Sequence, residues 1–154
     1  MNATIDCKAK ILPHLRERFG DDLLAVVLFG SRARQTERAF SDVDILLIID
    51  GLPQERRKHR QLAASIRRAL ALPIDATVLS PNVFLASVRY CAPLMIELAC
   101  AYEVWFEKDQ FFSKQLQFIH SLMQQSKLIQ LQPGVWKLPE DIDEMATDGI
   151  LIPA

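Results

Sequence analysis

Two apolar runs separated by a short polar segment constrain the fold of this 154-residue chain more than any other feature. The runs are Leu23–Phe29 (LLAVVLF) and Val43–Ile49 (VDILLII), and both are typical of strands buried on both faces. The connection from Ser31 to Ser41 is short for a parallel crossover, which usually needs a dozen or more residues and a helix. We therefore expect an antiparallel pair, which brings Gly30 beside Asp42.

The rest of the chain predicts strands that alternate with helices. Apolar residues at spacings of three and four predict a helix over residues 5–19, and Ser80 followed by Pro81 is typical of a helix start. Further helices are expected over 54–70, 93–101 and 109–125, and further strands over 73–79 and 102–106. These elements predict an α/β (α+β) fold with a mixed sheet of about four strands packed with helices.

The C-terminal segment, residues 132–154, differs from the rest of the chain. It is acidic, it shows no clear period, and it holds prolines at 133, 139 and 153. We expect one domain over residues 1–131, with 132–154 as a tail or arm docked through Val135, Trp136 and Ile150–Ile152. Trp136 could anchor this segment on the same chain, on a second copy or on a partner, because aromatic anchors dominate interfaces.

The overall composition excludes some classes of protein. Lys and Arg number 18 and Asp and Glu 19, a net charge of −1, which argues against a dedicated DNA-coating protein. The first ten residues lack a signal-peptide core, and the apolar runs are far short of a membrane span. The three cysteines have no metal-ligand spacing, which fits buried hydrophobes in a reducing cytoplasm.

The helix predicted over residues 54–70 is strongly basic. Its basic residues are Arg56, Arg57, Lys58, His59, Arg60, Arg67 and Arg68. One interpretation is a solvated helix face. The other is a patch that binds RNA or a protein partner, because such clusters supply phosphate contacts. These two interpretations do not decide whether the chain binds nucleic acid directly.

Asp42 and Asp44 are the first candidates for catalytic chemistry. They lie on one face of a strand, since side chains alternate with a period of two. Asp75 lies near the start of the next strand, and the three carboxylates converge if the two strands are parallel neighbours. The alternative interpretation of these aspartates is an ordinary strand end, at which the carboxylates are solvated and have no catalytic role. However, Asp is depleted in strands, and Asp44 and Asp75 are flanked by apolar residues.

Carboxylates held close together repel one another unless a cation lies between them. With oxygen ligands and no nearby Cys or His, the expected metal is a hard ion, Mg²⁺ or Mn²⁺. Three acids suit two such ions about 3.5–4 Å apart, as in enzymes of phosphoryl and nucleotidyl transfer. The sequence therefore predicts a two-metal site.

Gly30 and Ser31 supply a candidate phosphate site. Gly30 ends an apolar strand, so its backbone can approach a phosphate closely, and the Ser31 hydroxyl can donate to it. Arg32 and Arg34 follow and can pair with a triphosphate. The chain contains neither a Walker-type phosphate loop nor the glycine fingerprint of dinucleotide-binding folds.

These residues carry a resemblance to a known family. Gly30 and Ser31, then ten residues, then Asp42 and Asp44 resemble the signature of the DNA polymerase β-type nucleotidyltransferase superfamily. The small size is similar to its minimal nucleotidyltransferase (MNT) family. The resemblance covers roughly residues 25–107, with Asp75 at the position of the third acid. It implies the nucleotidyltransferase fold.

The resemblance also implies an activity and a set of roles. The family transfers a nucleoside monophosphate, here AMP, from ATP or another NTP to a hydroxyl, with release of pyrophosphate. By resemblance, the metals bind Asp42, Asp44 and Asp75, and Asp75 helps to deprotonate the acceptor. The nucleotide-binding residues are Gly30 and Ser31 for the β- and γ-phosphates, Arg32 and Arg34 for the triphosphate, and Ser41, which orients the acids.

The same resemblance implies a partner. Many MNT proteins resemble the antitoxin of a toxin–antitoxin system whose toxin is a small helical ribonuclease of the HEPN type. We therefore expect a protein adenylyltransferase-like antitoxin that modifies this toxin, as a homo- or hetero-oligomer. Two alternatives remain: a non-catalytic antitoxin that acts by binding alone, and a small-molecule, antibiotic-type nucleotidyltransferase.

Overall fold

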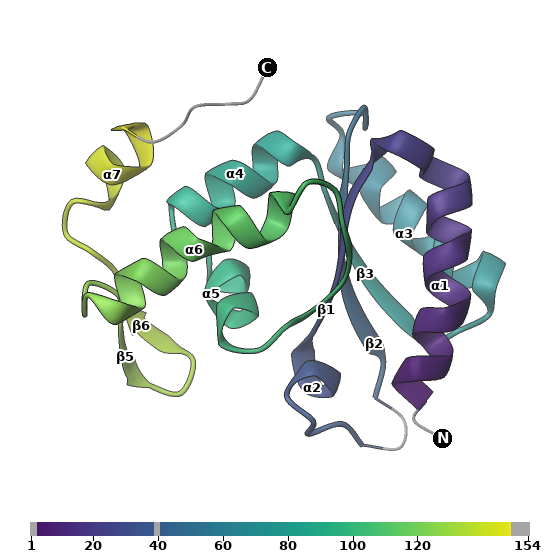
Figure 1. The fold of residues 1–154 in the computed structure, drawn as a ribbon, viewed down its shortest axis with the longest axis horizontal. Helices are drawn as coiled ribbons and strands as arrows, with labels where there is room; N and C mark the ends of the chain where they lie inside the picture. Colours follow the sequence, from purple (N-terminus) through teal and green to yellow (C-terminus); the bar gives the residue numbers. More distant parts are fainter. Residues whose placement is uncertain (1–2, 39–40, 149–154) are drawn as a thin grey trace.

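Strands and helices alternate along the chain in the computed structural model, which describes residues 3–38 and 41–148 (Figure 1). In chain order the elements are α1 (Ala3–Phe19), the short 3₁₀ helix η1 (Gly20–Asp22), β1 (Leu23–Phe29), α2 (Gly30–Ala33), β2 (Val43–Ile49), α3 (Arg56–Leu70), β3 (Ile74–Leu79), α4 (Pro81–Arg89), α5 (Pro93–Cys100), β4 (Glu103–Glu107), α6 (Phe111–Gln124), β5 (Ile129–Gln132), β6 (Val135–Lys137) and α7 (Ile142–Asp148). The predicted elements are present with small shifts of their ends. The predicted cap of α4 is confirmed, because the Ser80 hydroxyl accepts the Val83 N–H at 3.4 Å.

Strands β1 to β4 form one mixed sheet in the order β3-β2-β1-β4. β1 is antiparallel to β2 and β4, whereas β2 and β3 are parallel. The predicted mixed sheet and its antiparallel first pair are therefore confirmed. Phe29 lies opposite Asp44, and Asp44 lies beside Asp75. The end of β1 and the starts of β2 and β3 consequently meet at one end of the sheet.

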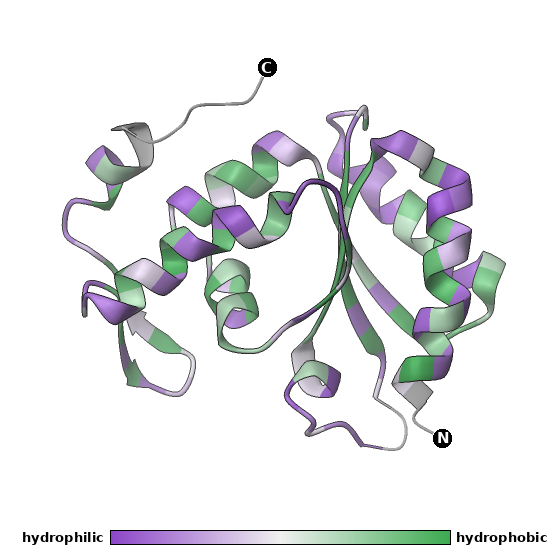
Figure 2. Ribbon diagram, in the orientation of Figure 1, coloured by the Kyte–Doolittle hydropathy of each residue, from purple (hydrophilic) through white to green (hydrophobic). Residues whose placement is uncertain are grey.

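The sheet has a hydrophobic core on each face, which explains why β1 and β2 are continuously apolar. Figure 1 shows α1 and α3 on one face and α4, α5 and α6 on the other. The residues facing α1 and α3 include Val26, Leu28, Ile45 and Leu47. Those facing α4 to α6 include Val27, Phe29, Leu46 and Ile48. Figure 2 shows the middle of the sheet hydrophobic and the helices mixed.

Helices α4 and α5 are short and apolar. Of the described helices, none is by itself long and apolar enough to cross a bilayer, and α4 and α5 meet the length and composition test only as a pair bent by 83°. Phe84 and Val88 of α4, and Met95 and Leu98 of α5, are buried in the core.

The C-terminal segment contains regular structure that the sequence reading did not anticipate. β5 and β6 form an antiparallel hairpin, and α7 follows it. Trp136, Ile142 and Met145 pack against the core formed with α4 to α6. The boundary expected after residue 131 falls inside β5, and the division of the chain there stays a prediction. Ile150–Ile152, the other expected docking point, lies outside the described residues.

Candidate active site

The strand register gathers the candidate carboxylates at one end of the sheet. β1 is antiparallel to β2, so its last residue, Phe29, pairs with Asp44 near the start of β2. β3 is parallel to β2, so the two strands begin together and Asp44 pairs with Asp75. Residues paired in this way project from the same face of a sheet, on strands about 4.8 Å apart. Two carboxylates distant in sequence are thus neighbours.

Gly30 is fitted closely against Asp44. It has a φ of +73°, in the left-handed region, and a Cβ atom added here would lie 2.2 Å from Asp44 Oδ2. Only glycine therefore allows the turn between β1 and α2 to accommodate this carboxylate. The sequence reading assigned Gly30 to a close approach of a phosphate, and that role stays a prediction. The contact that the structure gives Gly30 is with an acid.

Asp44 lies in an electrostatically unfavourable position. Burial raises the pKa of its carboxyl, and the charges of Asp75, Asp42 and Glu97 raise this pKa further, in that order. Arg34 lowers the pKa of Asp44 and only partly opposes these effects. An accumulation of negative charge around a half-buried carboxylate is an arrangement that a bound cation stabilises. The all-oxygen donor set fits a hard divalent ion in chemical terms.

Asp42 is engaged by a basic residue of α3. Its Oδ2 lies 3.6 Å from Arg67 Nη1, which also donates to the Ile74 carbonyl at 3.1 Å. With the side chains in these positions, no three His, Cys, Asp or Glu side chains in the described part of the chain are grouped to hold a metal. Asp42 would have to leave Arg67 to join Asp44 and Asp75 around an ion.

Arg32 connects the site to α1. Its guanidinium donates to Thr4 Oγ1 at 3.2 Å and to the Ser41 carbonyl at 2.8 Å. The Ser41 hydroxyl accepts the backbone N–H of Arg38 at 2.8 Å. These contacts tie α2 to α1 and to the segment that immediately precedes Asp42. The roles of Arg32 and Ser41 toward a nucleotide stay predictions.

Replacing Arg32 with Ala is expected to lower the free energy of unfolding by about 1–3 kcal/mol, because hydrogen bonds made by a charged group at a partly buried site are lost. Urea unfolding measures this difference. Arg34→Ala is a matched control, since Arg34 makes an exposed ion pair and exposed pairs contribute about 1 kcal/mol or less. Equal effects of the two substitutions would contradict a bracing role for Arg32.

The remaining predicted residues, Ser31 and Arg34, lie at the start and just after the end of α2. Ser31 is half-buried at the start of α2, and its carbonyl accepts the backbone N–H of Thr36 at 2.8 Å. Arg34 Nη1 lies 3.3 Å from Glu97 Oε1 on α5, which joins α2 to the helical layer. The sequence analysis predicted neither a role for Glu97 nor the contact between Arg67 and Asp42. A signal existed for Glu97, which is the charged residue in the apolar stretch PLMIELAC.

Residues 10–92 match the family described as "Polymerase beta, Nucleotidyltransferase". The chain is 28% identical over 136 residues to the "Putative protein adenylyltransferase MJ1305" of Methanocaldococcus jannaschii, over 85% of this chain and 91% of that protein.

Solved structures share the fold, and two of them show the extent of the similarity to this chain. One is a crystal structure of a toxin–antitoxin with AMP-PNP, with a TM-score of 0.51 and 20% identity over 77% of this chain and 90% of that one. The other is a chain from Shewanella oneidensis, with a TM-score of 0.50 and 14% identity over 82% and 90%.

Proposed function

Because this chain belongs to the polymerase β-type nucleotidyltransferase family, we propose that it transfers AMP from ATP to a hydroxyl group of a partner protein. The observation that carries this proposal is the pairing of Asp44 with Asp75 on adjacent parallel strands, beside the Gly30 turn. The protein adenylyltransferase name of the archaeal relative supports a protein acceptor and an adenylyl group.

The proposed reaction is a single displacement at phosphorus. The acceptor oxygen bonds to the α-phosphorus of ATP, the bond to pyrophosphate breaks, and the hydroxyl proton passes to the Asp75 carboxylate. Gly30 and Ser31 hold the β- and γ-phosphates, and Arg34 contributes positive charge next to them. Asp75 is suited to the acceptor side because its side chain is exposed on β3, an edge strand of the sheet.

Asp42, Asp44 and Asp75 would hold the divalent ions, two Mg²⁺ or Mn²⁺. Bound there, the ions supply positive charge that neutralises the phosphates and lowers the pKa of the acceptor hydroxyl. The raised pKa of Asp44 fits this assignment, because burial, and then the charges of Asp75, Asp42 and Glu97, oppose its ionisation, and Arg34 only partly offsets them. Asp42 is available for this role once its exposed pairing with Arg67 opens.

We propose a HEPN-type toxin as the partner, so that the chain acts as an antitoxin. The support is the shared fold with a chain from a toxin–antitoxin crystallised with AMP-PNP, an ATP analogue. An antitoxin that acts by binding alone would neutralise its toxin without nucleotide transfer, and a small-molecule transferase would label no protein. Both alternatives predict an unlabelled partner protein, so labelling of the partner from ATP distinguishes the proposal from either of them.

We expect that the chain, purified with the protein encoded by the adjacent gene, labels that protein from α-³²P-ATP in the presence of Mg²⁺. EDTA should abolish labelling, because the carboxylates then lack their counter-ions. γ-³²P-ATP is the matched control and should leave the partner unlabelled, since the γ-phosphate departs with pyrophosphate. Labelling from γ-³²P-ATP, or equal labelling with EDTA, would contradict the proposed function.

A further inference from the structure

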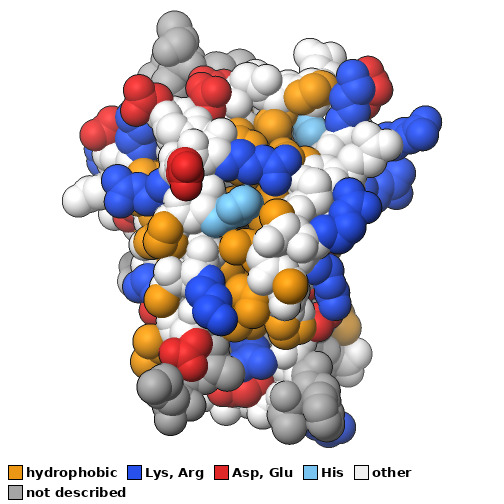
Figure 3. Space-filling model, turned by 90° about the vertical axis from the view of Figure 1, so that its right-hand side faces the viewer, with side chains coloured by type: hydrophobic (Ala, Val, Ile, Leu, Met, Phe, Trp, Pro, Cys, Tyr) orange, Lys and Arg blue, Asp and Glu red, His pale blue; other side chains and the backbone are white. Residues whose placement is uncertain are grey.

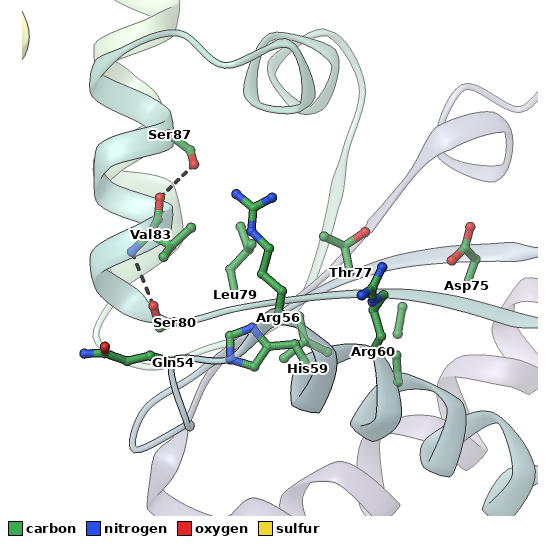
Figure 4. Close-up of a pocket in the computed structure, with 13 residues that line it drawn as sticks. Gln54, Arg56, His59, Arg60, Asp75, Thr77, Leu79, Ser80, Val83 and Ser87 are labelled. Atoms are coloured by element: carbon green, nitrogen blue, oxygen red, sulfur yellow. Dashed lines mark hydrogen bonds between the residues drawn. The ribbon is translucent and has the colours of Figure 1, made fainter.

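A cavity of about 700 Å³ lies along β3, with Asp75 at one end (Figure 4). It is lined by five consecutive residues of β3, 75–79, by α3 and by the first turns of α4. Gly30 and Ser31 do not line it. The cavity therefore meets the candidate active site at Asp75. It approaches Asp75 from the side away from the predicted phosphate site.

The strand that lines the cavity has an open edge. β3 is one of the two edge strands of the four-stranded sheet, and among the described residues it pairs only with β2. The Pro73 carbonyl accepts the Val43 N–H, so alternation directs the backbone groups of Asp75 and Thr77 toward β2. The backbone groups of Ala76 and Val78 consequently face outward, into the cavity. Such an edge can pair with an added strand.

The helical wall of the cavity is positively charged. Arg56 and Arg60 extend from α3 alongside β3, and the His59 ring lies at the same wall (Figure 4). Among the described residues, neither Arg56 nor Arg60 has an ion-pair partner. Figure 3 shows lysine and arginine side chains gathered along one side of the face that α1 and α3 form. A chain with a net charge of −1 thus concentrates positive charge here.

We propose that this cavity holds an extended acidic peptide segment of the acceptor protein, which pairs with the β3 edge and presents its hydroxyl at Asp75. Arg56 and Arg60 provide the complementary charge. An open strand edge favours peptide over RNA, because a sugar–phosphate backbone cannot continue the hydrogen-bond ladder of a sheet.

The position of the cavity agrees with the geometry of the reaction. In an in-line displacement the attacking and leaving oxygens lie on opposite sides of the phosphorus atom. Pyrophosphate would leave toward Gly30 and Ser31, so the acceptor must approach from the opposite side, where the cavity reaches Asp75. This inference rests on the proposed function, and it adds the chemical class of the acceptor and its route to the site.

Two synthetic peptides test the class of acceptor: a decapeptide of alternating Glu and Tyr, and one of alternating Lys and Tyr. With α-³²P-ATP and Mg²⁺, we expect the Glu–Tyr peptide to be labelled at least about tenfold faster at equal concentration. The Arg56→Glu/Arg60→Glu variant should reverse this preference. Equal labelling of both peptides by the unmodified chain would overturn the inference.

Steady-state kinetics with the partner protein show whether the two arginines act on binding of the acceptor or on binding of ATP. Arg56→Glu/Arg60→Glu should raise the KM for the partner about tenfold or more and leave the KM for ATP unchanged. Arg57→Glu/Arg68→Glu is the matched control, because it makes the same charge change on α3 with residues that do not line the cavity. Equal rises of the KM for the partner in both variants would show a general charge effect and overturn the inference.

Hydrogen exchange tests the strand pairing without any substitution. Addition of the partner protein should protect the amides of Ala76 and Val78 from exchange. If these amides stay unprotected while RNA binds with a strong salt dependence, the cavity is a nucleic-acid site and the inference fails. If the unmodified chain transfers nothing to any acceptor, the proposed function itself fails, which is a distinguishable result.

Discussion

Replacing Asp44 with Asn is expected to lower the rate of nucleotidyl transfer by about 100- to 1,000-fold, the range in which loss of one electrostatic group of an active site usually falls. The same substitution should raise the melting temperature of the metal-free protein at neutral pH. Asn keeps the size of the side chain and the space that Gly30 leaves for it, but it removes the negative charge beside Asp75.

The expected rise in stability follows from the raised pKa of Asp44. Burial, and then the charges of Asp75, Asp42 and Glu97, make the folded chain bind this proton more tightly than the unfolded chain does. The contribution of Asp44 to stability is therefore full below the unfolded pKa and is lost as the pH rises through the folded pKa. At neutral pH the ionised carboxylate destabilises the fold, and Asn relieves this cost.

Thermal unfolding and α-³²P-ATP transfer, measured on the same preparations, test both expectations. Asp50→Asn is a matched control at the other end of β2, where the Asp50 carboxylate accepts the Gly51 N–H at 2.9 Å. This control should keep its transfer rate. Mg²⁺ should raise the melting temperature of the unmodified chain more than that of Asp44→Asn, because bound ligand stabilises the folded state. A lowered melting temperature together with full transfer in Asp44→Asn would contradict the assignment of Asp44 as a metal-binding, catalytic carboxylate.

Replacing Gly30 with Ala is expected to impair both transfer and stability. The new Cβ would lie 2.2 Å from Asp44 Oδ2, and the φ of +73° is unfavourable for any residue with a Cβ. The carboxylate must therefore move away from its place beside Asp75. We expect the free energy of unfolding to fall by about 1–3 kcal/mol, from strain and crowding together, and transfer to fall at least tenfold.

Gly134→Ala separates backbone strain from the clash. Gly134 has a φ of +78°, close to that of Gly30, but nothing lies within 4 Å of its added Cβ. This control should cost only the strain of the left-handed backbone, about 1–2 kcal/mol, and should leave transfer unchanged. Chemical unfolding and transfer assays on both variants measure the difference. If Gly30→Ala transferred AMP as fast as Gly134→Ala, the close fit against Asp44 would have no catalytic role.

Much of the fold could be predicted because burial leaves a direct pattern in the sequence. Leu23–Phe29 and Val43–Ile49 are apolar at nearly every position because helices cover both faces of the sheet. The short connection between them dictated an antiparallel pair, which the structure confirms. The pairing of Asp44 with Asp75 then follows from a parallel β3, which the sequence reading treated as a condition and the structure provides.

Contacts that depend on tertiary packing left no such pattern. Arg32 reaches Thr4 across 28 positions in the sequence, and Asp42 pairs with Arg67, so spacing along the chain could not reveal either contact. The β5–β6 hairpin was missed because its strands are short and mostly exposed. The Pro133–Gly134 pair was a turn signal for this hairpin.

The parallel register of β2 and β3 has a consequence for how sequences of this kind can diverge. Side chains alternate along a strand, so sliding β3 by one residue would send Asp75 through the sheet to the α3 side and bring a neighbour beside Asp44. The apolar residues of β3 would still find a hydrophobic layer on either face. An odd-numbered insertion or deletion between α3 and β3 could thus leave a folded chain with no third carboxylate at the site. Inactive descendants could arise through the length of this connection, with every aspartate still present in the sequence.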